Sequence, residues 1–116
     1  MENLNGKVFL SVPHENTLDF FNDCIFHYTQ DQIIVTATFY SKSICYGELV
    51  GMANKTGILH VIFNLFCTDS TFHSGICDFH ERRFADCYIL CGKVTLAGEN
   101  EITKEIVLQE ISTTSK

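Results

Sequence analysis

Polar side chains recur at alternate positions along three successive stretches of the chain, and these are the residues that could bind a ligand. Residues two apart point to the same face of a β-strand. If the three faces turn inward together, they predict a polar patch inside an otherwise apolar cavity, which is the usual character of a small-molecule pocket. The alternative is that this face is the solvent side of the sheet. The candidate ligand-binding residues are Tyr46, Glu48, His60, Asn64, Asp78 and His80.

The segment from His73 to His80 holds the densest group of possible metal ligands and nucleophiles. His73 and Cys77 would share one strand face, while Asp78 and His80 would share the other. A structural zinc site commonly needs four converging ligands, and a catalytic cysteine needs an exposed thiol beside a base. Two ligands on each face do not converge, and Cys77 lies on the face expected to be internal. The sequence therefore predicts no metal site, no catalytic residue and no cofactor.

Short segments rich in β-branched and aromatic residues must position these side chains, and their composition is typical of β-strands. The links between them are too short for parallel crossovers, so the sheet is expected to be antiparallel with sequence neighbours paired. An open sheet would expose its two edge strands, and closing the sheet into a barrel would remove these edges. The fold class predicted is all-β, a single up-and-down meander of about 8–10 strands closed into a small lipocalin-like barrel. The expected strands are 7–11, 24–29, 33–40, 43–52, 58–67, 71–80, 85–94 and 101–111.

Alternation also predicts which residues share a face of the sheet, while it leaves open which face points into the barrel. In the strand 58–67, Leu59, Val61, Phe63 and Leu65 share one face. In the strand 43–52, Cys45, Gly47, Leu49 and Gly51 share one face, with Ile44 on the opposite one. Glycines inside a strand favour tight curvature or close backbone approach, so these two indicate closure.

The remaining segments are expected to be links and ends. Residues 14–23 form a short helix or a loop, and Glu81-Arg82-Arg83 is expected to be a polar turn, with an anion site as the alternative. The whole chain, residues 1–116, is expected to be one domain, with a polar and frayed tail at 112–116.

Composition excludes several classes of partner. The formal net charge is −6, and no stripe of Lys or Arg compensates for it, so nucleic acid is not an expected partner. No apolar run approaches the ~20 residues of a membrane helix. The N-terminus lacks the basic start and apolar stretch of a signal peptide. The six cysteines are therefore expected to be reduced and mostly buried in a cytoplasmic protein.

Several strand and turn segments between Gly6 and Ile111 together match a known pattern. These segments are 26–30, 37–40, Ile44 with 47–51, 57–59, 75–77 and 110–111. In their order and spacing the chain resembles small bacterial proteins of similar length that carry the name N-acetylglutamate synthase. It departs from the pattern at 41–43, where relatives usually have glycines, and in having no tryptophan in the strand 85–94.

The resemblance implies a lipocalin-like or avidin-like barrel, and its name implies acetyl transfer from acetyl-CoA to glutamate. A typical acetyltransferase holds the CoA pyrophosphate at a helix N-terminus after a glycine-containing loop, and the sequence offers no such loop before a helix. The leading expectation is a non-catalytic barrel that binds a small molecule or a protein partner. The alternatives are the acetyltransferase and a structural protein that self-associates, for example as a homodimer.

Overall fold

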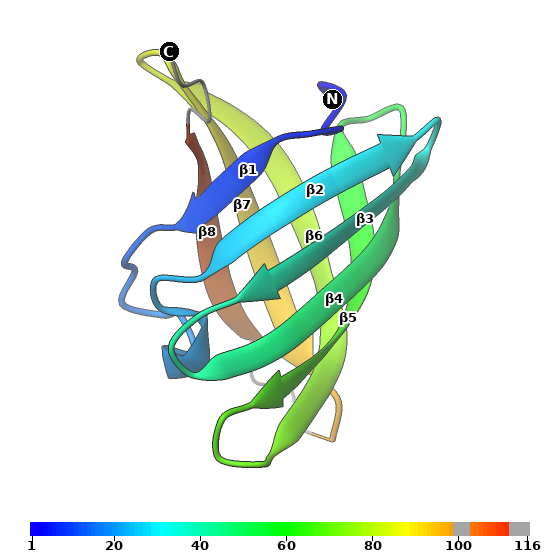
Figure 1. Ribbon diagram of the computed structural model, residues 1–116. Helices are drawn as coiled ribbons and strands as arrows, with labels where there is room; N and C mark the ends of the chain where they lie inside the picture. The colour runs from blue at the N-terminus through cyan, green and yellow to red at the C-terminus, as the bar shows by residue number, and fades with distance from the viewer. Residues whose placement is uncertain (99–102, 112–116) are drawn as a thin grey trace.

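The computed structural model describes residues 1–98 and 103–111, and eight antiparallel strands there close into a barrel (Figure 1). Each strand pairs with its neighbours in sequence, and β1 pairs with β8 to complete the ring. The predicted all-β, up-and-down, closed antiparallel barrel is confirmed. The strands are β1 (Val8–Ser11), β2 (Ile25–Asp31), β3 (Ile34–Tyr40), β4 (Ile44–Ala53), β5 (Ile58–Cys67), β6 (Phe72–Phe84), β7 (Cys87–Leu96) and β8 (Thr103–Ile111).

One predicted link differs from the structure, and another matches one of its two predicted forms. Glu81-Arg82-Arg83 is not a turn but the last part of β6, and the chain reverses after it at Ala85, which has a φ of 56°. The segment 14–23 is a loop that contains a single 3-10 turn, η1 (Asp19–Phe21). The predicted start of the last strand at Glu101 and the predicted fraying of 112–116 lie outside the described residues. In the described part of the chain, no helix has the length and apolar character that crossing a bilayer requires.

The grouping of residues into faces is correct for β5 and partly wrong for β4. Leu59, Val61, Phe63 and Leu65 share one face, as predicted, and all four are buried, so this face points into the barrel. A register irregularity between Ile44 and Tyr46 shifts the start of β4, however. An extra residue in one strand reverses the alternation locally, so Ile44 is buried and Cys45 is exposed, the opposite of the expected arrangement.

The glycines of β4 lie where the barrel wall leaves no room for a side chain. A Cβ atom on Gly51 would overlap the backbone carbonyl of His60, and one on Gly47 would overlap the ring of Phe39. Glycine is therefore required for close approach at both positions. This agrees with the tight closure that the sequence predicts.

Aromatic side chains fill the interior of the barrel. The rings of Phe26 and Phe39 stack with centroids 4.6 Å apart, and Phe9 meets Tyr28 edge to face at 5.3 Å. The void that remains at the centre measures about 10 Å³, which is room for no more than one water molecule. This void is therefore too small to hold a ligand. The buried aromatic residues are Phe9, Phe21, Phe26, Tyr28, Phe39, Phe63, Phe79 and Tyr88.

The loop between β1 and β2 closes one end of the barrel. Phe21 is buried there, with its ring 5.9 Å from that of Phe63, and Phe20 stacks on His73 at 4.9 Å. The hydroxyl of Ser11 fixes the loop, because it donates to the carbonyl of Phe21 and accepts from the amide of Cys24. This end of the barrel is therefore filled by side chains.

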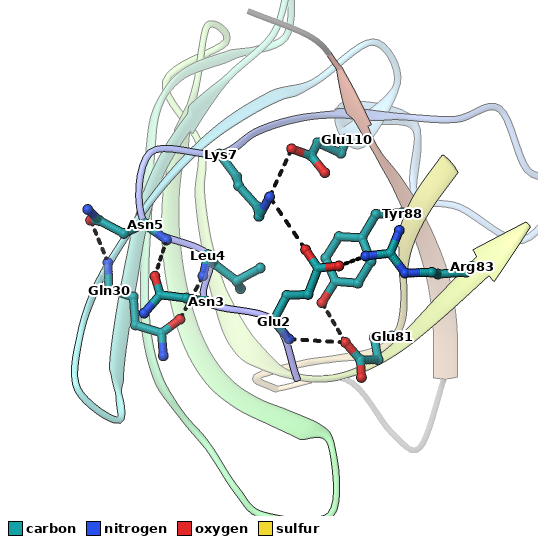
Figure 2. A network of polar contacts seen from close by, with 10 residues as sticks. All are labelled: Glu2, Asn3, Leu4, Asn5, Lys7, Gln30, Glu81, Arg83, Tyr88 and Glu110. Carbon is teal, nitrogen blue, oxygen red and sulfur yellow. Dashed lines mark hydrogen bonds and ion pairs between the residues drawn. The ribbon is translucent and has the colours of Figure 1, made fainter. Parts of the chain in front are cut away.

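The N-terminal segment lies across the opposite end (Figure 1). Leu4 is completely buried, and its amide donates to the side chain of Gln30 at 2.8 Å. Around it, Figure 2 shows a network in which Lys7 pairs with Glu2 and Glu110, and Arg83 pairs with Glu2. The network fastens residues 1–7 to β6 and β8. Arg83 thus forms an ion pair within the chain, which replaces the anion site considered for the Arg82-Arg83 pair.

Two buried tyrosines differ in whether their hydroxyl groups form a hydrogen bond. The Tyr88 hydroxyl donates to Glu81 at 2.7 Å, whereas the Tyr28 hydroxyl has no hydrogen-bond partner among residues 1–98 and 103–111. Burial is the main cause that raises the pKa of both phenols, and at Tyr88 the hydrogen bond to Glu81 adds to it. Both side chains are therefore neutral at physiological pH.

We expect the two Tyr→Phe variants to differ in sign. Tyr28→Phe should leave the free energy of unfolding unchanged or raise it by about 1 kcal/mol, because it removes a buried polar group that has no partner. Tyr88→Phe should lower it by about 1 kcal/mol, because it breaks a hydrogen bond to a charged group. Urea denaturation of both variants measures these changes, and a clear loss of stability in Tyr28→Phe would contradict the assignment.

The thiols are free, as the sequence predicts, but only half of them are buried. Cys24, Cys67 and Cys77 are buried, Cys87 and Cys91 are partly buried, and Cys45 is exposed at the β4 irregularity. Burial raises the pKa of Cys24 to about 12 and raises that of Cys77 as well. Thiolate is the reactive form of cysteine, so these two side chains serve as small apolar groups of the core.

Candidate functional site

The six candidate binding residues all lie on the outer face of the barrel. Each is exposed, while the residues that alternate with them fill the interior. The internal polar cavity considered from the sequence is therefore a wrong interpretation, and the solvent-side alternative is correct. The physical reason is the aromatic content of the opposite face, whose large side chains take up the whole interior. Whether the six residues bind a ligand is a separate question, and it stays a prediction.

Three of the six residues, Tyr46, Glu48 and Asn64, line a hollow on the outer wall over β2 to β5. Its volume is about 390 Å³, within the usual range of small-molecule sites. Strand register explains why they meet, since Glu48 pairs with Asn64 on β5 and with Thr38 on β3. The hollow is thus formed by neighbouring strands of one wall. The other polar residues that line it are His27, Thr29, Thr36 and Thr38.

Hydrogen bonds hold several of these side chains in place. The hydroxyls of Thr29 and Thr36 lie 2.5 Å apart across β2 and β3. The hydroxyl of Tyr46 donates to Glu48 Oε1 at 3.2 Å. Desolvation and this hydrogen bond both raise the pKa of Tyr46, so its phenol keeps its proton. The polar part of the hollow therefore consists of hydroxyls, the imidazole of His27, the amide of Asn64 and a single carboxylate, that of Glu48.

His60 and Asp78 form a separate pair further along the same wall. His60 Nδ1 donates to Asp78 Oδ1 at 2.7 Å, and the side-chain amide of Asn54 lies 3.4 Å from His60 Nε2. The two residues are cross-strand partners on β5 and β6. Cross-strand pairs of this kind stabilise a sheet. The pair borders a second and wider hollow, above β4 to β6.

His80 belongs to neither group. It lies on β6 beside a third hollow of about 260 Å³, together with His14, Arg82, Lys93 and Glu105. His14 Nε2 and a Glu105 carboxylate oxygen are 3.3 Å apart. The structure therefore divides the six candidates into a group of three, a pair and a single residue.

Neither a metal cluster nor a paired nucleophile and base is present in the part of the site that the structure describes. Among residues 1–98 and 103–111, no cluster of three or more His, Cys, Asp or Glu side chains could hold a metal ion. The hydrogen bonds of the His60 ring go to Asp78 and Asn54 and not to a serine or cysteine nucleophile. A nucleophile must lie within hydrogen-bond reach of its base. The pair can orient or bind a polar group, and the hydrogen-bond partners of His60 in the described ranges are Asp78 and Asn54.

Sequence reasoning missed the contribution of β2 and β3 to the first hollow. Thr36 and Thr38 alternate along β3 just as Tyr46 and Glu48 do along β4, and that alternation is visible in the sequence. The sequence does not give the register of the strands, however. It is the register that sets Thr38 beside Glu48 on one side and beside His27 on the other. The even spacing of hydroxyls along 34–40 was the available signal.

Comparison with known proteins agrees with this architecture. A family model described as avidin-like protein matches residues 2–111, which is nearly the whole chain. No match is found among the curated proteins or among the solved structures. The match spans all eight strands of the closed barrel. The chain therefore belongs to the avidin-like protein family.

Proposed function

We propose that this protein is a non-catalytic barrel that binds a small ligand in the outer hollow over β2 to β5. One observation carries the proposal. The interior retains a void of only about 10 Å³, whereas the outer hollow measures about 390 Å³ and is lined by polar groups. Both ends of the barrel are also covered, by Leu4 at one and Phe21 at the other. The protein would act as a single domain in a bacterial cytoplasm.

The polar groups of the hollow favour a neutral, hydroxyl-rich ligand. Thr29, Thr36 and Thr38 offer hydroxyls that both donate and accept, and Asn64 offers an amide. The exposed ring of Tyr46 provides an apolar surface beside them. Such a mixture of apolar wall and a few convergent polar groups is typical of small-molecule sites. Sugars and inositols have hydroxyl patterns of the matching kind.

The carboxylate of Glu48 sets the charge preference of the site. Within the described ranges, no Lys, Arg or His forms an ion pair with it. One of its oxygens accepts from Tyr46, and the remaining acceptor positions are free for hydroxyl donors of a ligand. An anionic ligand would meet uncompensated repulsion there. The proposal therefore favours neutral sugars over phosphorylated and carboxylated ones as ligands.

Saturation-transfer NMR with D-glucose, D-galactose, D-mannose and myo-inositol tests the proposal. We expect at least one of them to bind the purified protein, and Glu48→Gln to weaken that binding about tenfold through loss of a charged acceptor. Glu105→Gln is the matched control, because it makes the same change on the outer face of β8, away from the hollow. The proposal fails if none of the four binds, or if both variants bind as the parent does.

The enzymatic alternative has its own test. If the protein transferred an acetyl group to glutamate, purified protein would release free CoA from acetyl-CoA in a glutamate-dependent reaction. We expect no release above the rate without protein. Glutamate-dependent release that scales with protein concentration would overturn the non-catalytic proposal.

A further inference from the structure

Four aromatic side chains stand in one row across the outer wall of the barrel, on strands β3 to β6. Tyr46 on β4 pairs with Phe66 on β5, and Phe66 pairs with Phe72 on β6. Tyr40 on β3 lies at the level of Tyr46, one residue beyond the last pair of the β3–β4 ladder. The four side chains are between 46% and 72% exposed. They form an aromatic band that faces water.

The rings of the aromatic band lie close enough together to act as one surface. The ring centroids of Phe66 and Phe72 are 5.7 Å apart, and Tyr40 stacks on His27 at 6.0 Å. Neighbouring strands are about 4.8 Å apart, so the band spans about 14 Å from β3 to β6. A half-exposed ring leaves on the order of 100 Å² in water, which gives about 400 Å² for the four. Apolar patches of that size commonly mark a binding site.

A row of hydrogen-bonding side chains runs beside the aromatic band, two residues further along each strand. Glu48 pairs with Thr38 on one side and with Asn64 on the other, and Asn64 pairs with Ser74. This polar row lies about 7 Å from the aromatic band, because side chains on one face of a strand recur at every second residue. A ring that rests on the aromatic band can therefore extend its substituents to the polar row.

The end of the wall that carries Phe66 and Phe72 is held in a fixed shape. In the link between β5 and β6, a carboxylate oxygen of Asp69 accepts hydrogen bonds from the amide and the hydroxyl of Thr71. The amide of Cys67 donates to the carbonyl of Thr71 at 2.7 Å, which closes the hairpin. A ligand would not have to order this link on binding, and such preorganisation favours affinity.

The chemistry of the two rows favours a neutral chain that is rich in hydroxyl groups. The face of an aromatic ring is electron-rich and attracts the C–H groups on one side of a sugar ring, while the sugar hydroxyls reach the polar row. Nucleic acid bases also stack on aromatic rings. The net charge of −6 and the carboxylate of Glu48 oppose their phosphates, however.

A proline-rich peptide is another ligand that aromatic surfaces commonly bind. It matches the polar row less well than a sugar does. Proline has no backbone N–H, so such a peptide brings few donors to the carboxylate of Glu48. Each sugar hydroxyl can both donate and accept a hydrogen bond. The combination of an aromatic band with an acceptor-containing polar row therefore favours a sugar chain.

We infer that the aromatic band and the hollow over β2 to β5 together form an extended site for a neutral oligosaccharide. The hollow holds one sugar unit, and Tyr46 joins the two parts because it belongs to the band and also lines the hollow. Further units stack along Phe66 and Phe72, neither of which lines the hollow. The inference rests on the proposed function and deepens it, from a small hydroxyl-rich ligand to a chain of linked sugars.

Isothermal titration calorimetry with single sugars and their linked forms is the test. The probes are D-glucose with cellotriose and maltotriose, D-mannose with 1,4-linked mannotriose, and D-galactose with 1,4-linked galactotriose. We expect at least one trisaccharide to bind about tenfold more tightly than its monosaccharide, because stacking on the aromatic band adds to the contacts in the hollow. If every trisaccharide binds no more tightly than its monosaccharide, the inference is wrong.

The variant Phe72→Ala separates the aromatic band from the hollow. We expect it to weaken trisaccharide binding about tenfold and to leave monosaccharide binding unchanged, because Phe72 does not line the hollow. Phe84→Ala is the matched control, since it also removes an exposed phenylalanine of β6 but at the other end of the strand. Equal trisaccharide affinities of the two variants would overturn the inference.

The two proposals fail in different ways in these experiments. A protein that binds a monosaccharide but gains nothing from the linked sugar keeps the proposed function and loses the extended site. If Glu48→Gln binds as the parent does while Phe72→Ala is weakened, the aromatic band binds the sugar and the hollow does not.

NMR of the bound trisaccharide gives a second measurement. Sugar C–H protons that stack on an aromatic face should shift upfield through the ring current and show NOEs to the ring protons of Phe66 and Phe72. NOEs confined to other parts of the barrel would contradict the extended site. So would a titration in which decaproline binds to the aromatic band and none of the trisaccharides does.

Discussion

Replacing Phe39 with alanine is expected to lower the free energy of unfolding by about 3–5 kcal/mol. The ring of Phe39 is buried, stacks on Phe26 with centroids 4.6 Å apart and lies 6.2 Å from Phe21. Its neighbour across the strand pair is Gly47, which has no side chain that could move into the space left behind. The surrounding core can therefore relax little, and the cost of the cavity is added to the loss of apolar burial.

The matched control for this variant is Tyr40→Ala, the adjacent aromatic residue on the same strand. Tyr40 is 48% exposed and stacks on His27 on the outside of the barrel. We expect its loss to cost less than about 1 kcal/mol, which is usual for exposed positions. Chemical denaturation of both variants gives the comparison. Equal losses at the two positions would contradict the assignment of inner and outer faces.

Leu4→Ala is expected to lower the free energy of unfolding by about 3 kcal/mol, although the residue precedes the first strand. Terminal residues outside secondary structure usually contribute little to stability. Here Leu4 is completely buried over one end of the barrel, and the hydrogen bond from its amide to Gln30 fixes the segment. Removing the side chain should leave that end of the aromatic core open to water.

Thermal and urea denaturation measure this loss, with Ile33→Ala as the control. Ile33 is also aliphatic and also lies outside the strands, but it is 53% exposed, so its truncation should cost less than about 1 kcal/mol. If Leu4→Ala is as stable as Ile33→Ala, the N-terminal segment does not close the barrel in solution.

Much of the barrel could be predicted because strand alternation and short links leave few other arrangements. The strand at 58–67 was predicted with its bounds and faces, since Leu59, Val61 and Phe63 alternate with polar or exposed positions along its length. The start of β4 was wrong, because one additional residue near Cys45 reverses the alternation and no local residue signals it. The end of β6 was wrong because a polar run was taken for a turn, although strands on a barrel wall can carry charges outward.

The candidate site was only partly predictable. Alternation identified Tyr46, Glu48 and Asn64 as members of one face, but alternation is the same whether that face points inward or outward. Whether a face points inward depends on which face carries more apolar volume over the whole barrel. That volume is a property of all eight strands together and not of one strand. Exposed Ile62 and Val50 made the outer face resemble the lining of a cavity, because large aliphatic side chains are more common inside a protein.

The central claim is that this barrel binds through its outer wall and not through its interior. The most direct test is to map chemical-shift changes in ¹⁵N- and methyl-labelled protein during titration with whichever of the four sugars binds. We predict that the changes concentrate at Thr36, Thr38, Glu48 and Asn64, while the methyl groups of interior residues such as Leu65 and Leu90 stay unchanged. Changes centred on the interior methyl groups, with the outer wall unaffected, would contradict the account.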